Sequence, residues 1–281
     1  MKGISTTVKE APSLNKTAAL LPEKGSRISL WGVYSVWHRH AKVYQKTWLV
    51  NFLPPVSEPI IYLVAFGYGL TPLVGDVSYG DRSVGYLQFI APGMIAIGVL
   101  FQSFFEGAYG SFIRLNFQKT WQALLTAPLS FTEVFLGDWL WAATRGTIAG
   151  LMTGVVAMLW GLYSGWHLVV SSLLIFLGSL LFAAAGLFVA GTVRTIDQIN
   201  VPIFLFVVPM FTLCGTYFPR TTLPPFLEKV ADFLPLAAFV DLLRWPLELP
   251  TFWPLSLLWL LLWIGGLAVL AWRQIYPKLF H

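Results

Sequence analysis

Long apolar stretches separated by shorter polar connections dominate the sequence from residue 49 onward. Six of them approach or exceed the roughly 20 residues that a helix needs to cross a bilayer. They lie at about 49–70, 86–111, 134–162, 168–191, 201–218 and 254–274. Pro54, Pro55 and Pro59 fall in the first stretch, so we expect this span to be kinked or broken. The pattern predicts an all-α polytopic membrane protein whose six transmembrane helices form one domain over 49–278.

The residues before the first span divide into two parts. Residues 1–28 are polar and contain no apolar run of signal-peptide length, so we expect a flexible cytoplasmic tail. Residues 29–48 place apolar side chains on one helical face and basic ones mostly on the other: Leu30, Val33, Tyr34, Trp37, Ala41, Tyr44 and Trp48 against Arg39, Lys42 and Lys46. Such a helix lies in the headgroup plane of a membrane. The same pattern also fits a helical lead-in to the first span.

Two connections carry helical patterns of their own. In 112–133 apolar residues recur at helical spacing and stop at a proline: Phe117, Trp121, Leu124, Leu125 and Pro128. The connection 219–253 is long and apolar, and Phe226, Val230, Phe233 and Leu234 repeat within it at helical spacing. Long connections without structure of their own are uncommon. We therefore expect one short helix in the first connection and one or two in the second, re-entering the membrane from outside.

Composition narrows the class of protein. Of the 281 residues, 57% are apolar and only 11% are charged, and the mean hydropathy is +0.70. A soluble domain is about a quarter charged, so this composition excludes a soluble domain, a disordered chain and a disulfide scaffold. Cys214 is the single cysteine and forms no intrachain disulfide. The net charge of +5 does not indicate nucleic-acid binding, because the basic residues stand at the ends of apolar runs.

The basic residues also predict an orientation. Taking the N-terminal tail as cytoplasmic, thirteen Lys and Arg residues fall in inner segments and four in outer ones, namely Arg82, Arg220, Lys229 and Arg244. Cytoplasmic flanks of spans are enriched in Lys and Arg. This asymmetry predicts that both termini lie inside the cell, which agrees with an even number of spans.

Motifs for catalysis are missing. The sequence has neither the G-x-x-x-x-G-K-[ST] of a phosphate-binding loop nor a G-x-S-x-G nucleophile elbow. His38, His40, His167 and His281 are scattered, with no Cys or carboxylate at metal spacing, so we expect no metal site. A membrane-embedded enzyme is accordingly the weakest of the functions considered.

Four charged residues fall within predicted spans, where charge is costly. They are Glu58, Glu106, Asp138 and Arg145. The second and third spans are antiparallel neighbours in sequence, so Glu106 and Arg145 are expected to meet at one level and neutralise each other. Such a pair fits a polar element in a transport path, and it equally fits a structural ion pair with side chains reaching toward the interface.

Small residues recur at every fourth position of the third span, at Ala142, Gly146, Gly150 and Gly154. A ridge of this kind lets two helix backbones approach closely. It fits packing within the subunit and packing across a dimer.

Four segments resemble those of type-2 ABC exporter permeases. They are SEPIIYLVAFGYGL (57–70), TWQALLTAPLS (120–130), LGDWLWAATRGTIAG (136–150) and TYFPRTTLPPFLEKVADFLPLAAFVDLLR (216–244). The order of the four, together with six spans and an interfacial helix, is most similar to the nodulation-factor exporter permeases, which export lipo-oligosaccharides. Polysaccharide exporter permeases are relatives of that branch.

The resemblance implies the transmembrane subunit of an ATP-driven exporter in the inner membrane. Two copies form the path for an amphipathic or lipid-linked substrate, and two separate ABC ATPase subunits bind ATP and Mg²⁺. This chain then needs no cofactor and is no enzyme. Helix 117–126 is expected to dock on the ATPase through Phe117, Trp121 and Leu125, with Lys119 and Gln122 at the rim. The alternative is a self-contained secondary transporter or channel with Glu58, Glu106 and Arg145 as an ion relay.

Overall fold

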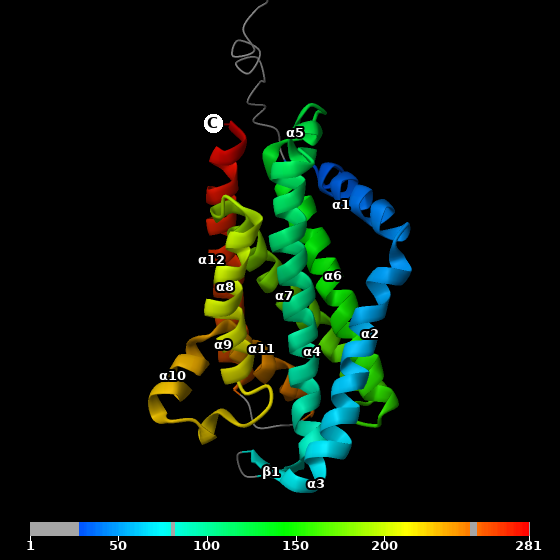
Figure 1. The fold of residues 1–281 in the computed structure, drawn as a ribbon, viewed down its shortest axis with the longest axis vertical. Helices are drawn as coiled ribbons and strands as arrows, with labels where there is room; N and C mark the ends of the chain where they lie inside the picture. Colours follow the sequence, from blue (N-terminus) through cyan, green and yellow to red (C-terminus); the bar gives the residue numbers. More distant parts are fainter. Residues whose placement is uncertain (1–27, 80–81, 248–251, 281) are drawn as a thin grey trace, which may run out of the picture.

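The computed structural model describes residues 28–79, 82–247 and 252–280, and for 50–52, 54–56, 58 and 59 it describes the backbone only. Long helices run along the main axis of the molecule, and shorter elements cover its two ends (Figure 1). We call the end that carries the short helix α5 (Thr120–Leu125) the α5 end. The opposite end carries a hairpin of β1 (Asp76–Tyr79) and β2 (Arg82–Gly85), and we call it the hairpin end.

Five helical stretches of the described chain are long and apolar enough to cross a membrane. They are Tyr86–Phe117, Phe131–Leu159, Gly165–Thr192, Ile196–Leu213 and Trp253–Phe280. The first comprises α4 (Tyr86–Phe105) and two π-helical segments, η3 (Glu106–Gly110) and η4 (Ile113–Phe117). The next two are α6 (Phe131–Leu159) and α7 (Gly165–Thr192), and the last is α12 (Trp253–Phe280). The fourth is built from η5 (Ile196–Ile199), α8 (Asn200–Pro202), η6 (Ile203–Val207) and α9 (Val208–Leu213).

The first predicted span is not among these five stretches. Here α2 (Trp48–Val64), η2 (Ala65–Leu70) and α3 (Thr71–Val74) follow one another directly. The helix is therefore not broken at its three prolines. Its apolar part within the described residues, Ile60–Val74, is shorter than the other five. The structure thus supports a multi-pass helical membrane protein with five full-length candidate spans, and a sixth crossing by α2 stays a prediction.

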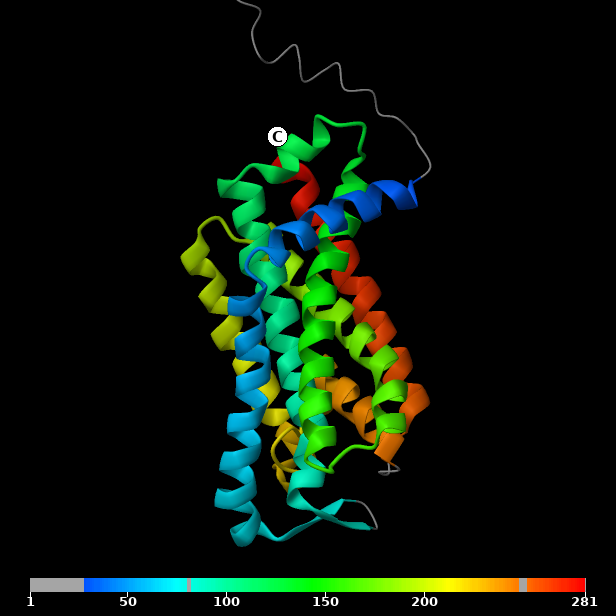
Figure 2. The same ribbon diagram turned by 90° about the vertical axis from the view of Figure 1, so that its right-hand side faces the viewer.

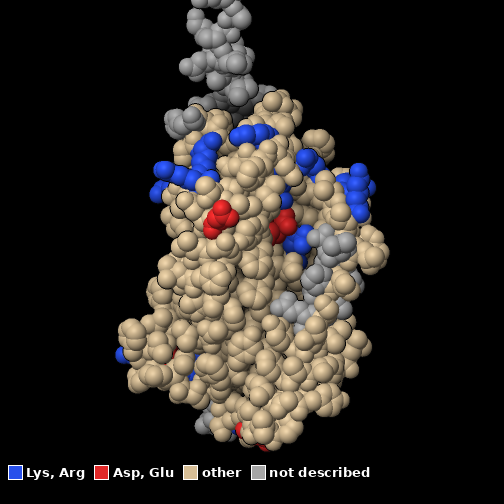
Figure 3. Space-filling model, viewed as in Figure 1, with Lys and Arg blue, Asp and Glu red and all other residues tan. Residues whose placement is uncertain are grey.

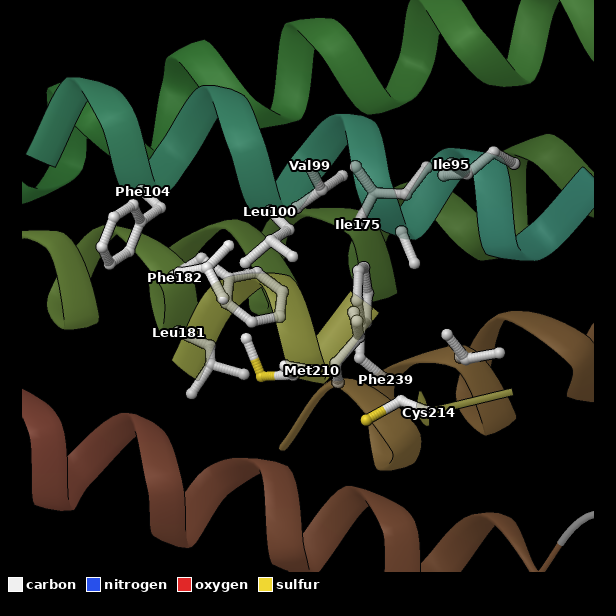
Figure 4. Close-up of a cluster of buried hydrophobic side chains, with 14 of the residues drawn as sticks. Ile95, Val99, Leu100, Phe104, Ile175, Leu181, Phe182, Met210, Cys214 and Phe239 are labelled. Atoms are coloured by element: carbon white, nitrogen blue, oxygen red, sulfur yellow. The ribbon is translucent and has the colours of Figure 1, made fainter. Parts of the chain in front are cut away.

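Helix α7 lies at the centre of the bundle and packs against α4, α6 and α12. Helices α2 and α12 flank the bundle on opposite sides in both views (Figures 1 and 2). Figure 4 shows the core of this arrangement, where Leu100 of α4 and Phe182 of α7 meet Met210 of α9 and Phe239 of α11 (Pro235–Arg244). A short helix from the hairpin end therefore supplies part of the central apolar core.

The ridge of small residues on α6 packs within the subunit. All four members are buried. A methyl group added to Gly146 would collide with the Ser103 hydroxyl of α4, and one added to Gly150 would lie 2.5 Å from Val99 and 2.7 Å from Ile175. The ridge thus packs against α4 on one side and α7 on the other. Of the two alternatives left open by the sequence, the structure favours packing within the subunit over packing across a dimer.

Helix α1 (Leu30–Gln45) crosses the α5 end at an angle to the long helices (Figure 2). It buries Gly32, Val36 and His40 against α6, while Trp31 and Tyr34 are exposed. Gly32 and Gly137 permit this approach, since a methyl group on Gly137 would lie 2.6 Å from Val36. A helix is thus present where 29–48 predicts one, but it ends at Gln45, and Trp48 belongs to α2. Its buried face carries His40 rather than the most apolar residues, and its location in the headgroup plane stays a prediction.

The connection between the last two spans folds into short helices, as predicted. They are η7 (Arg220–Thr222), α10 (Pro225–Phe233), α11 and η8 (Trp245–Leu247). The β1–β2 hairpin, with Val77 opposite Val84, was not predicted. Its four-residue strands are too short to give a sequence signal that stands out between two helices.

Arg244 at the end of α11 is buried rather than exposed in a loop, with only 1% of its surface accessible. Its guanidinium donates to the carbonyl oxygens of Gly215 and Phe89 and stacks 4.1 Å from the centre of the Phe89 ring. Burial lowers its pKa. The nearby Asp241 pairs instead with Arg220 at 2.8 Å. Carbonyl groups and aromatic faces therefore stabilise this cation and fasten α11 to α4.

Candidate functional site

A buried carboxylate, Asp138 of α6, joins three elements near the α5 end. Its side chain is 0% exposed. It accepts a hydrogen bond from the Ser111 hydroxyl at 2.6 Å and forms an ion pair with Arg114 Nε at 2.8 Å. His40 Nε2 of α1 lies 3.0 Å from Asp138 Oδ1, the same oxygen that Arg114 contacts, whereas Ser111 bonds Oδ2. Since a buried charge is tolerated only when it is paired and hydrogen-bonded, these contacts fix α1, α6 and the helix ending at Phe117 relative to one another.

Glu106 extends the network toward Arg145. One carboxylate oxygen of Glu106 accepts from Arg114 Nη1 at 2.7 Å and from Trp141 Nε1 at 3.0 Å. The other lies 3.5 Å from Arg145 Nη1. Arg145 also donates to Gln102 Oε1 at 3.3 Å. Glu106, Arg114, Asp138 and Arg145, together with His40, thus form one connected group, which we call the charged network.

The structure brings together three of the four intramembrane charges that the sequence singles out. Glu106 and Arg145 meet, as the antiparallel register of their spans predicts. Asp138 joins them through Arg114, which contacts both carboxylates. The side chain of Glu58 lies outside the described part of the structure.

Sequence reasoning missed Arg114 and His40. Arg114 was counted as a cytoplasmic flank, but its eight-residue separation from Glu106 places both on one side of the helix. The π turns at Glu106–Gly110 and Ile113–Phe117 shift the faces of this helix, and such turns occur frequently at functional sites. His40 was considered only as a metal ligand and was not paired with any carboxylate. Its pairing with Asp138 joins residues 98 positions apart, which no local pattern reports.

Among the described residues no group of three or more His, Cys, Asp or Glu residues is arranged to hold a metal ion. The charged network contains two carboxylates, and arginines occupy both of them. This arrangement can bind helices together and can interact with an anion, but it offers no open set of metal ligands.

The short helix α5 forms the second part of the candidate site, and here one prediction is wrong. Trp121 was expected to fill a cleft on a partner, but it is 1% exposed. Its ring packs against two rings of α6: its centre lies 6.1 Å from that of Phe131 and 6.5 Å from that of Phe135. The helical spacing of apolar residues correctly identifies a face of α5 that is buried. That face packs against this protein's own α6, not against a partner protein.

The other predicted docking residues lie on different sides of this turn. Phe117 is 67% exposed, and Lys119 is also exposed. Leu125 is half-buried against the cluster around Trp121, and Gln122 is half-buried and donates to the carbonyl oxygen of Leu115. We call the exposed residues Phe117, Gln118, Lys119, Ala123 and Thr126 the α5 tip.

Lys119 has a positive φ of 52°, which no other non-glycine residue of the described chain has. This left-handed conformation costs roughly 1–2 kcal/mol for an L-residue. It occurs where the long helix ends at Phe117 and α5 begins at Thr120. The turn therefore directs Phe117 and Lys119 away from the protein, whereas Trp121 points into it.

Comparison with known proteins identifies the family. Residues 32–247, which include most of α1, the charged network and α5, match the model of the ABC-2 type transporter. The chain belongs to the ABC-2 type transporter family. This permease is thus a transmembrane subunit without a nucleotide-binding site of its own, as the sequence predicts. Family membership decides against the self-contained secondary transporter or channel.

Its relatives include proteins from several bacteria. Over 211 residues the permease is 35% identical to nodulation protein J of Rhizobium leguminosarum bv. viciae, covering 75% of this chain and 80% of that protein. It is 34% identical to nodulation protein J of Bradyrhizobium diazoefficiens over 75% of this chain and 79% of that protein. It is 26% identical to the inner membrane transport permease YadH of Escherichia coli over 75% of this chain and 80% of that protein.

Proposed function

We propose that two copies of this permease form the membrane path of an ATP-driven exporter and that two ABC ATPase subunits, which bind ATP and Mg²⁺, dock on the α5 tip. The substrate is an amphipathic or lipid-linked molecule, of the lipo-oligosaccharide, polysaccharide, lipid or drug class. Similarity to the nodulation proteins favours a lipo-oligosaccharide. Lipid substrates also suit a chain with 57% apolar residues.

The observation that carries this proposal is that α5 and the turn before it have an exposed side and a side buried against α6. A lever that transmits force needs a part that the partner grips and a part fixed to the moving body. Phe117 and Lys119 are exposed, whereas Trp121 is buried against Phe131 at the start of α6. Phe131 in turn contacts Tyr276 of α12, with ring centres 5.2 Å apart. A push on the α5 tip is therefore passed to α6 and α12 through packed aromatic rings.

The charged network supplies a second connection. Arg114 precedes Phe117 by one turn of the same helix and is paired with Asp138 of α6. His40 connects the same carboxylate to α1. Because the charges neutralise one another, we interpret the network as a structural element that moves as a unit during transport, rather than as an ion relay.

Phe117→Ala is expected to weaken binding of the ATPase by roughly thirtyfold in Kd, or about 2 kcal/mol, because exposed aromatic side chains are frequent anchors of interfaces. The permease should fold normally, since Phe117 is mostly exposed. Co-purification of a co-expressed ABC ATPase subunit and ATP-driven transport in vesicles measure the effect.

Two further variants make this test specific. Phe226→Ala removes an equally exposed ring of α10 at the hairpin end and should leave ATPase binding unchanged. Trp121→Ala should instead lower the free energy of unfolding by about 3 to 5 kcal/mol, as for other buried tryptophans. Unaltered ATPase binding and transport by the Phe117 variant would remove the α5 tip from the mechanism.

We also propose an inner-membrane location with both termini in the cytoplasm. Lys and Arg side chains gather around the α5 end, where α12 finishes, and are few over the rest of the visible face (Figure 3). This distribution supports the orientation expected from the thirteen inner and four outer basic residues.

Cysteine labelling tests this orientation. In a Cys214→Ala background, Lys229→Cys of α10 is expected to react with a membrane-impermeant maleimide from outside intact cells, because Lys229 is exposed at the hairpin end. Ala123→Cys of α5 should react only in inside-out vesicles. Labelling of both positions from the same side would contradict the proposed six-span topology.

A further inference from the structure

A hollow of about 310 Å³ lies between α1, the helix ending at Phe117, and α6. Arg39, His40 and Tyr44 line it from α1, and Glu106, Trp141 and Arg145 line it from the long helices. It is therefore bordered by one side of the charged network and by a helix that carries basic residues. It adjoins the α5 tip at Gln118, which lines it, but Phe117 and Lys119 do not line it.

The charges around this hollow do not balance. Glu106 and Asp138 are neutralised by Arg114 and Arg145. Arg39 adds a further positive charge at the rim, and it has no carboxylate partner within 4.0 Å among the described residues. The hollow thus has a surplus of positive charge that the described part of the chain does not compensate.

Two guanidinium groups retain donors for a ligand. The Arg39 side chain makes no hydrogen bond to another described residue. Arg145 uses one nitrogen toward Gln102 and one, at 3.5 Å, toward Glu106, and its planar group is held over the Tyr44 ring at 4.8 Å. An arginine has five N–H donors in a fixed fork that matches the oxygens of a phosphate. Stacking on Tyr44 restricts the guanidinium before any ligand arrives.

The hollow lies beneath a helix suited to the headgroup region. Trp31 and Tyr34 of α1 are exposed, as are Arg39 and Lys42. Exposed aromatic and basic side chains on one amphipathic helix are typical of the membrane interface. At that depth the abundant anion is the phosphate of lipids, and basic pockets between membrane helices bind lipid headgroups.

We propose that this hollow is a binding site for a phosphate group, held by Arg39 and Arg145 between α1 and the bundle. The site is a property of this chain and is independent of the transported substrate and of the docking of an ATPase. A phosphate bound there connects Arg39 of α1 to Arg145 of α6. This connection is separate from the contact between His40 and Asp138.

Calorimetric titration of the detergent-purified permease tests the site. Dihexanoyl phosphatidic acid, a water-soluble short-chain lipid with an exposed phosphate, is expected to bind the unaltered protein and to bind more weakly as salt is added. Arg39→Gln should weaken binding by about tenfold, because one charge-assisted contact is lost. Arg39 is exposed, so this variant is expected to fold.

Matched variants separate a built site from general surface charge. Lys42→Gln removes one positive charge from the same helix outside the hollow, and it should change the affinity by less than about twofold, as expected for an exposed charge in salt. Arg145→Lys keeps the charge beside Glu106 but removes the planar fork, and it should weaken binding as Arg39→Gln does. Equal losses in the Lys42 and Arg39 variants would overturn the proposal, as would wild-type affinity in both arginine variants.

Inorganic phosphate distinguishes the two sources of the anion. Binding of inorganic phosphate as tightly as the lipid, with the same dependence on Arg39, means that the phosphate group alone is recognised. Tight binding of the lipid and weak binding of inorganic phosphate mean that the site takes a lipid headgroup and its chains. A third outcome would overturn the proposal. If dihexanoyl phosphatidylcholine binds regardless of Arg39 while dihexanoyl phosphatidic acid does not bind, the hollow is not an anion site.

Discussion

Replacing Asp138 with asparagine is expected to lower the free energy of unfolding by about 3 to 5 kcal/mol, the cost of breaking a buried ion pair from one side. Asparagine retains the shape of the side chain but removes the charge opposite Arg114 Nε and His40. Arg114 then keeps only Glu106, which also faces Arg145. Unfolding of the purified permease by SDS in mixed micelles, followed by circular dichroism, measures the loss.

The second half of this experiment removes both charges of the pair. In the double variant Asp138→Asn with Arg114→Gln, Glu106 remains opposite Arg145, so the network is again neutral. The free energy of unfolding that the double variant loses should therefore be smaller than the sum of the two single losses. The difference should be at least about 1 kcal/mol, as for residues in direct contact.

Asp197→Asn serves as the matched control, because Asp197 is exposed and has no ion pair among the described residues. It should change stability by less than about 0.5 kcal/mol. An Asp138→Asn loss as small as that of the control would contradict the assignment of Asp138 as the centre of the network. Strictly additive losses of Asp138→Asn and Arg114→Gln would mean that the two residues do not interact.

Gly186→Val is expected to prevent α4 and α7 from packing, with a loss of about 3 kcal/mol or more, at the upper end for overpacked cores. A Cβ atom at Gly186 would lie 2.8 Å from the Ala108 nitrogen and would collide with the Phe104 carbonyl oxygen. Both atoms belong to the backbone, so they cannot turn away as a side chain can. The fraction of monodisperse protein on size-exclusion chromatography and its unfolding temperature report the result.

Gly265→Val on α12 provides the comparison, since a Cβ atom there has nothing within 4 Å. Because glycine is less favourable than valine within a helix, this change should leave the free energy of unfolding the same or raise it by about a few tenths of a kcal/mol. Gly186→Ala, with one methyl group, should fall between wild type and Gly186→Val. Equal stability of the Gly186 and Gly265 valine variants would show that α4 and α7 do not cross where the structure has them.

Several features of this permease follow from the sequence because they depend on neighbours along the chain. Apolar runs of spanning length predict the long helices, since a helix in lipid satisfies its backbone hydrogen bonds internally. The mixed aromatic and basic pattern of 29–48 predicts α1, and helical spacing with a proline stop predicts α5. The contact of Glu106 with Arg145 is also predictable, because two consecutive spans joined by a short connection must run antiparallel.

Only the tertiary structure decides which partner each side chain meets. Trp121 belongs to an apolar face in the sequence, and the fold turns that face onto Phe131 rather than toward another protein. Arg114 and Arg244 count as flanking charges along the chain, yet one is held by Asp138 and the other by carbonyl oxygens and the Phe89 ring. The physical reason is that periodicity identifies which residues share a face, whereas the identity of the opposing surface depends on contacts between residues far apart in sequence. For His40 and Asp138, 98 positions apart, that surface exists only once α1 has packed across α6.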